Sequence, residues 1–357
     1  MSAARQELSG NVRNSPGELE SRKKAWSARL ASAGPGCASL LSSALAEEED
    51  GVVAEAIELA LLESREGASA DPLLRALERR GLGANGALVR SVGALGGERG
   101  TRLLLGLLDE LDREWAKVER AVRGPERISR IRQLAEVRFA LIEALGLGAD
   151  PAGLERLFAM LGKLEPTEYG SAVRASVRAS IRCALERTPD QGEEAERAAG
   201  VVSRALGELR GEALAEMLDE IDDRRSPGLL AAIGRILDRT SALRALSPEP
   251  ATERRAAVAA LRVFVVGGQR PPDPAAIALV TGLLDDPDEA IRLVAASDLG
   301  ASGEVSSIPR LIDALERDPS AAVRSEARTA LVKLGGGVDR GDARAWREWW
   351  NAGRPRG

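Results

Sequence analysis

Two stretches near the end of the chain carry the same pattern of residues, 32 positions apart. The paired positions are Asp286 and Asp318, Pro287 and Pro319, Arg292 and Arg324, Ala295 and Ala327, Leu299 and Leu331, and Gly303 and Gly335. A fixed-period repeat of this length indicates helical hairpins that cannot bury their apolar faces alone and therefore stack on neighbours. The repeat predicts an all-α protein, an α-solenoid or superhelix of stacked antiparallel helical hairpins.

Weaker copies of the pattern predict that the stack extends far back along the chain. The arginine and the apolar positions recur from Arg254 to Leu261 and from Arg138 to Gly146, and the Asp-Pro turn is largely missing before residue 120. Glycines of the type that ends helices separate the helical segments. We expect one elongated body, in four parts: a mobile N-terminal tail over 1–16, an N-terminal helix and linker over 17–50, the solenoid over 51–337, and a Trp-rich C-terminal capping helix and tail over 338–357.

The Asp-Pro turn of each clear repeat predicts how its second helix begins. Pro287 and Pro319 have the fixed dihedral angle that suits the first turn of a helix. Asp286 and Asp318 would then accept hydrogen bonds from the exposed N–H groups of that turn.

An arginine follows each of these aspartates by six positions, and this combination resembles HEAT repeats. In particular, the pattern resembles the short form found in bacterial HEAT-like, phycobilin-lyase-type repeat proteins. The resemblance implies that Asp286, Arg292, Asp318 and Arg324 form a hydrogen-bonded ladder between successive hairpins. Their implied role is structural and not catalytic.

Three tryptophans, Trp346, Trp349 and Trp350, lie on one face of the last predicted helix. A solenoid needs a cap over the open apolar edge of its last unit. We expect this face to form that cap, with an aromatic ligand-binding platform as the alternative.

Arg174, Arg178 and Arg182 follow one another at helical spacing and form a basic row. The row is a candidate site for an acidic partner. Because arginine is abundant throughout the chain, the alternative is an ordinary solvated helix face.

The chain contains no histidine, which excludes imidazole bases, Ser-His-Asp and Cys-His nucleophiles and histidine metal sites. We therefore expect no catalytic residue, no metal and no cofactor. The net charge of -5 argues against nucleic acid as the partner. No apolar run reaches the length of a membrane span. The cytoplasm is the expected compartment, although the apolar stretch 38–46 after Arg22-Lys23-Lys24 leaves secretion open.

The repeats favour a non-enzymatic scaffold or adaptor that binds an unknown protein or peptide along a concave helical surface. The alternative is an enzyme on the same fold, because the resemblance extends to phycobilin lyases, deoxyhypusine hydroxylase and a group of DNA glycosylases. The hydroxylase needs histidine and is excluded. A glycosylase would need a basic cleft with aromatic and acidic residues, and only Trp115 with Asp112, Arg113 and Arg120 offers such an interior cluster. The partner, the pathway and the oligomeric state stay open.

Overall fold

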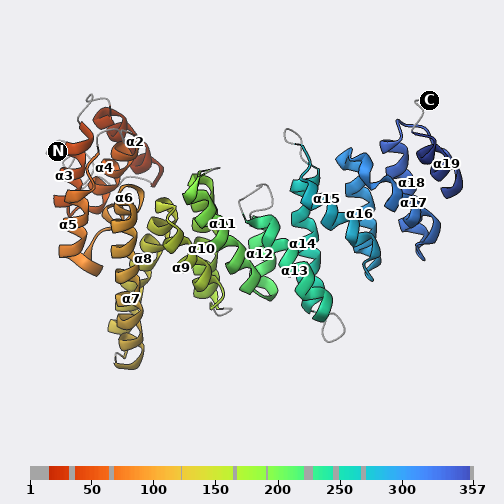
Figure 1. Cartoon of the computed structure of the whole chain (residues 1–357). Coiled ribbons are helices and arrows are strands. Elements are labelled where there is room, and N and C mark those ends of the chain that lie inside the picture. Colours follow the sequence, from red (N-terminus) through yellow and green to blue (C-terminus); the bar gives the residue numbers. More distant parts are fainter. Residues whose placement is uncertain are drawn as a thin grey trace. The chain divides into compact units, whose positions relative to one another are not determined.

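The computed structural model of the chain describes residues 16–31, 37–63, 68–121, 123–163, 167–189, 192–220, 228–243, 249–266 and 271–353. The regular secondary structure of these residues is helical, without a strand, which confirms the all-α prediction (Figure 1). The predicted tail over 1–16 falls almost entirely outside the described residues. Within them, no helix combines the length and the apolar character that crossing a bilayer requires.

The chain divides into two compact units, Met1–Val201 (unit 1) and Val202–Gly357 (unit 2). The expected division into four parts stays a prediction.

Unit 1 is built mainly from helical hairpins, each with a first and a second helix. Its elements are α2 (Pro16–Ala31), α3 (Cys37–Glu47), α4 (Gly51–Glu63), α5 (Asp71–Arg80), η1 (Gly81–Gly83), α6 (Gly86–Leu95), α7 (Gly97–Ala121), α8 (Pro125–Gly148), α9 (Pro151–Leu161), α10 (Glu168–Arg187) and α11 (Glu193–Glu208), which contains the unit boundary. The second helices α4, α6, α8 and α10 pack on one another in order, and α2 packs on α4.

Helix α3 corrects the predicted linker. Residues 37–47 form a helix that packs on α4 and α5, so they belong to the first hairpin. The stretch considered as a signal segment lies in this helix, with Leu41 and Leu45 buried.

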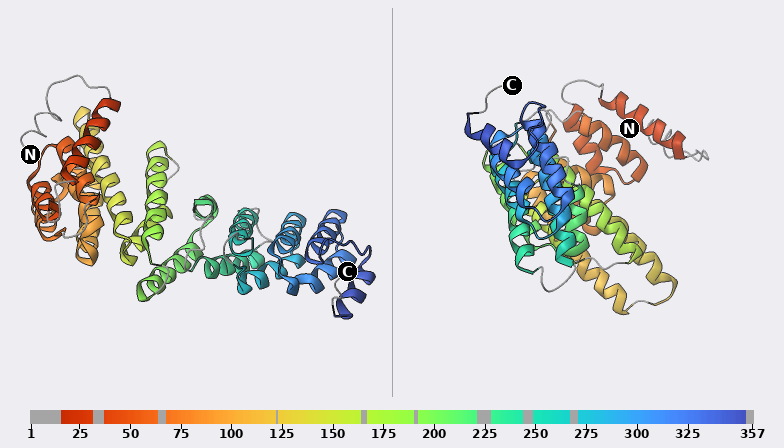
Figure 2. Two further views of the ribbon diagram at one scale, coloured as in Figure 1. Left: turned by 90° about the horizontal axis from the view of Figure 1, so that it is seen from above. Right: turned by 90° about the vertical axis from the view of Figure 1, so that its right-hand side faces the viewer.

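Unit 2 repeats the hairpin arrangement. Its elements are α12 (Gly211–Glu220), α13 (Leu229–Leu243), α14 (Glu249–Val265), α15 (Pro274–Gly282), η2 (Leu283–Asp285), α16 (Glu289–Ser302), η3 (Val305–Ser307), α17 (Ile308–Arg317), α18 (Ala321–Leu334) and α19 (Ala343–Asn351). The second helices α14, α16 and α18 form one layer, as Figure 2 also shows. The repeated Ala295, Leu299, Ala327 and Leu331 are fully buried between the helices, as expected.

The turn that starts each second helix differs in detail from the prediction. Asp288 and Ser320 are the N-cap residues, and they accept hydrogen bonds from the backbone N–H groups of Ala290 and Ala322. Pro287 lies before the cap, outside the first turn of α16. Both Asp and Ser can cap a helix, so the sequence alone left two candidate positions in each turn.

Glycines allow second helices to approach each other closely. A methyl group on Gly93 of α6 would lie 2.1 Å from the carbonyl oxygen of Ala144 on α8. A methyl group on Gly300 of α16 would lie 2.6 Å from Cβ of Ala330 on α18. Real Cβ atoms do not come this close, so these interfaces depend on the missing side chain.

Candidate protein-interaction surface

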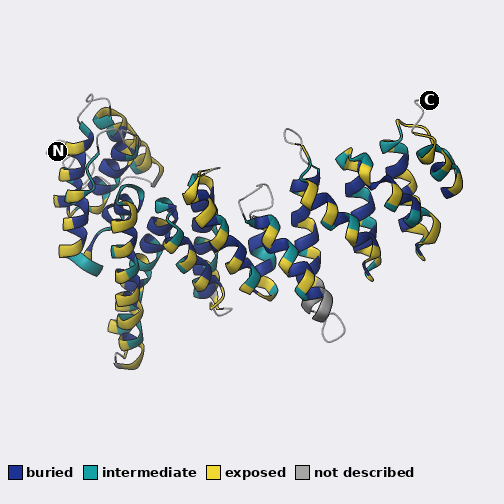
Figure 3. Cartoon of the chain, in the orientation of Figure 1, coloured by how far each residue is buried: buried dark blue, intermediate teal, exposed yellow. Residues whose placement is uncertain are grey.

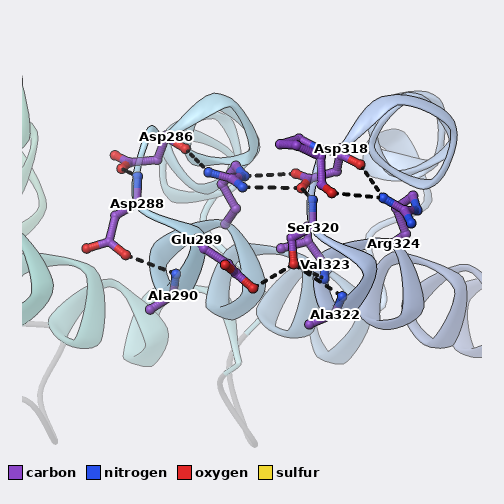
Figure 4. Close-up of polar contacts among 11 residues, drawn as sticks. Asp286, Asp288, Glu289, Ala290, Asp318, Ser320, Ala322, Val323 and Arg324 are labelled. Carbon is purple, nitrogen blue, oxygen red and sulfur yellow. Dashed lines mark hydrogen bonds and ion pairs between the residues drawn. The ribbon is translucent and has the colours of Figure 1, made fainter.

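The predicted ladder residues join successive hairpins of unit 2 (Figure 4). Arg292 on α16 donates from Nε and Nη2 to the two carboxylate oxygens of Asp318, at 2.8 and 3.2 Å. Its Nη1 donates to the backbone carbonyl of Asp286 at 2.7 Å. The hydrogen bond to Asp318 raises the pKa of Arg292. One guanidinium therefore connects the turns of two consecutive hairpins, with both side chains of the ion pair buried.

The ladder extends to Arg254 and ends at Arg324. Arg254 on α14 donates from Nε to the Asp286 carboxylate at 2.6 Å, so it repeats the contact that Arg292 makes with Asp318. Arg324 donates at 2.7 Å to the backbone carbonyl of Asp318, and the described residues after it supply no aspartate of a following turn. All five side chains are used within the stack, which leaves the ladder little capacity to bind a partner.

Unit 1 contains a charged bridge that the sequence patterns did not identify. Glu58 on α4 accepts two hydrogen bonds from Arg90 on α6, at 2.7 and 2.8 Å. Burial raises the pKa of Glu58, and the arginine opposes that shift. The sequence feature that could have identified this bridge is its spacing, because Glu58 and Arg90 are 32 positions apart, like the repeats of unit 2.

The exposed side of the second helices of unit 2 forms a broad surface, here named the second-helix face. On α16, Gly300 contacts α18, Asp298 lies near Arg262 of α14, and Leu299 is buried. Val294 lies on the remaining side and is 37% exposed. The exposed or partly exposed residues of the face are Thr252, Arg255, Ala259, Ala290, Val294, Ser297, Ala301, Ala322, Ser325 and Thr329. Most are small, so a partner can approach the helix backbones closely.

The family model described as HEAT repeats matches residues 236–332. This range includes the ladder residues and the second-helix face. The chain therefore contains HEAT repeats. The match and the stacked hairpins together establish the predicted α-solenoid fold. No curated protein matches the chain.

The tryptophans of α19 lie at the end of these HEAT repeats. Trp346 is fully buried and fills the space over Gly335, where a methyl group would lie 2.7 Å from the indole ring. Trp349 and Trp350 are partly buried. The Arg340 guanidinium lies 4.0 Å from the ring centroid of Trp349 and 4.7 Å from that of Trp346. Because α19 packs on α17, this geometry suits a cap more than an open aromatic platform.

The basic row on α10 is less open than a binding surface requires. Arg174 and Arg178 are partly buried and Arg182 is exposed, and each already has an interaction partner. The role of the row in partner binding stays a prediction.

The interior cluster around Trp115 contains the expected Asp112, but its arginine is Arg138 and not Arg113. Trp115 on α7 stacks on Tyr169 of α10 with ring centroids 5.1 Å apart. The Arg138 guanidinium lies 4.5 Å from the Trp115 centroid and donates to Asp112 at 2.7 Å. Arg113 instead bonds the backbone of its own helix. The cluster links α7, α8 and α10. Its aromatic faces are covered by these contacts, whereas a base-binding site would leave them open for stacking.

Proposed function

We propose that the chain is a non-enzymatic scaffold or adaptor that binds a protein or peptide partner on the second-helix face. The observation that carries the proposal is the continuity of this face across three stacked second helices, α14, α16 and α18. Stacked repeats present similar side chains at regular intervals, an arrangement suited to an elongated partner. The HEAT-repeat match covers the same helices and supports an interaction role.

The composition of the face supports a protein partner. The face combines small side chains with the exposed apolar Val294 and with the exposed charged side chains of Arg255, Arg262 and Lys333. Apolar contacts bordered by polar and charged residues are common at protein interfaces.

Affinity purification from the native cells tests the proposal. Val294→Arg with Thr329→Arg adds bulk and charge to the face without changing a buried residue. Ala275→Arg with Ala278→Arg is the matched control, because both alanines are exposed on the first helix α15. We expect the wild type and the control to retain a specific protein that the face variant loses. Equal recovery by both variants, or no specific protein with the wild type, would contradict the proposal.

A further inference from the structure

The end of the α7–α8 hairpin projects beyond the neighbouring helices of unit 1 (Figures 1 and 2). Residues 113–121 and 123–133 are named here the hairpin tip. Most of its residues are exposed, as Figure 3 shows. Trp115 and Arg138 hold the base of the tip against α10 through the stack on Tyr169. The tip is therefore accessible, and its base is held against α10.

The hairpin tip is strongly basic in a chain whose net charge is -5. Its basic residues are Arg113, Lys117, Arg120, Arg123, Arg127, Arg130 and Arg132. Its acidic residues are Glu114, Glu119 and Glu126. The charge of the tip is thus opposite in sign to that of the whole chain.

Most arginines of the tip have no acidic partner among the described residues. Glu114 pairs with Lys117 at 2.6 Å, and Glu119 accepts a hydrogen bond from Trp115 Nε1 at 3.0 Å. In that part of the chain, no ion pair involves Arg120, Arg123, Arg127 or Arg132, whereas Arg130 donates to Gln133 at 2.8 Å and also interacts with Glu114. A carboxylate that approaches the first four of these arginines would not have to displace an existing one.

An exposed isoleucine lies among these arginines. Ile128 is 64% exposed, and Ile131 follows it by one turn on the same side of α8 and is partly exposed. Arg127 and Arg132 flank the pair along the helix. Arginine around an apolar contact is a combination enriched in protein interfaces.

We propose that the hairpin tip is a second docking surface that binds an acidic amphipathic segment of a partner protein. Carboxylates of the segment pair with Arg127 and Arg132, which lie on either side of the isoleucine pair, and its apolar side covers Ile128. The interspersed Glu114, Glu119 and Glu126 disfavour the continuous phosphate row of a nucleic acid. A membrane surface would call for more apolar residues than the tip exposes. This surface is separate from the second-helix face, so the inference does not depend on the proposed function.

Fluorescence anisotropy with a labelled peptide tests the inference on the full chain. The peptide is a helix of about 18 residues, or five turns, with leucines on one side and glutamates on the other. Arg127→Glu and Arg132→Glu together should weaken binding at least about tenfold, because two attractive pairs become repulsive. Arg75→Glu with Arg102→Glu is the matched control, since it changes the net charge equally at exposed positions elsewhere. Ile128→Ser should weaken binding several-fold and leave its salt dependence unchanged.

The inference is overturned by an absence of binding to the wild type, by an equal loss in the control, or by tighter binding of duplex DNA or anionic phosphatidylserine vesicles that the tip variant loses. Hydrogen exchange of the complex places the peptide. Protection at the tip supports the inference, and protection confined to the second-helix face contradicts it. Val294→Arg with Thr329→Arg should leave peptide binding unchanged, so failure of either proposal is distinguishable from failure of the other.

Discussion

Arg292 makes the most consequential polar contact of the ladder, because its removal would leave the buried Asp318 carboxylate without its cation. We expect Arg292→Ala to lower the free energy of unfolding by about 3–5 kcal/mol, the usual effect of breaking a buried ion pair. Arg324 bonds only to backbone carbonyls and is partly exposed, so Arg324→Ala should cost about 1 kcal/mol. Urea denaturation followed by circular dichroism measures both. Equal losses would show that the ion pair contributes nothing beyond the backbone contact.

Asp298 should make the stability of unit 2 depend on pH. Its side chain is buried, and its nearest cation, Arg262, lies 3.6 Å away and is largely exposed. Burial raises the pKa of Asp298 from 3.8 to about 6, with Arg262 opposing the shift. The folded state therefore binds this proton more tightly than the unfolded state, so the stabilisation is complete below pH 4 and is lost as the pH rises through 6.

Asp298→Asn isolates this effect. The asparagine cannot ionise, so the variant should gain up to about 3 kcal/mol over the wild type at pH 7, and less as the pH falls toward 4. The difference in free energy of unfolding between the two proteins, measured by urea denaturation from pH 4 to pH 7.5, checks the sign. A pH-independent difference would mean that Asp298 titrates normally in the folded chain.

Sequence reasoning found the ladder residues because their side chains repeat at matching positions. It did not find Glu58 and Arg90, because that bridge joins residues within two helices and involves no Asp-Pro turn. It also misplaced the helix caps: Asp286 and Asp288 are both acceptable caps by residue type, and only the backbone geometry distinguishes them.

At the scale of the helix, Gly300 controls the distance between α16 and α18. Gly300→Ala places a methyl group 2.6 Å from Cβ of Ala330, so the helices must separate, and we expect a loss of about 1–3 kcal/mol. Gly106→Ala, in the middle of α7, is the control, because no atom beyond its own helix backbone lies within 4 Å of the place that the new methyl group would take. This change should stabilise the protein by about 0.5–1 kcal/mol. Thermal unfolding distinguishes the two, and a stabilising Gly300→Ala would refute close packing.

Helix α19 should keep the last hairpin from associating with other molecules. Trp346→Ala removes the buried indole over Gly335, and we expect a loss of about 3–5 kcal/mol. The exposed end of α17 and α18 should then promote self-association, measured by light scattering across a range of concentrations. Trp350→Ala is the control, because Trp350 is only partly buried. If both variants behave alike, the capping hypothesis for Trp346 is wrong.

Helix positions were predictable wherever glycine or proline separated two segments whose apolar residues recur at helical spacing, as in α7 and α8. Helix α3 was missed because Gly34-Pro35-Gly36 and the acidic run 47–50 suggested a linker, whereas Leu41 and Leu45 between them supply the buried face. Short helices of this kind gain most of their stability from packing, which local sequence does not display.

At the scale of the whole chain, the two compact units should unfold separately. Glu58→Ala breaks a bridge within unit 1 and should lower only one calorimetric transition. Arg292→Ala acts within unit 2 and should lower only the other. A single transition that both changes shift equally would show that the units fold as one cooperative body.

The periodic pattern predicts the kind of fold but not how the stack divides. Repeat energetics are local, so the pattern reads the same whether neighbouring hairpins belong to one compact unit or to two. The candidate surfaces were harder to predict still. The hairpin tip lies in helices that the sequence placed well, yet its exposure depends on how far α7 and α8 extend past their neighbours.

The ladder also has a direction, and this bears on how such a chain can change in length. The Asp-Pro turn of each hairpin accepts hydrogen bonds from the arginine of the preceding hairpin, and the second helix carries the arginine that binds the next turn. A segment such as 287–318 therefore contains one arginine of the ladder and the aspartate that it binds. A tandem duplication of this segment would supply each new arginine with an aspartate, and its deletion would rejoin Arg324 to the preceding turn. Genes for this fold can therefore gain or lose whole units in a single step. The loops between hairpins can differ in length, because Arg254 reaches Asp286 across 32 positions and Arg292 reaches Asp318 across 26.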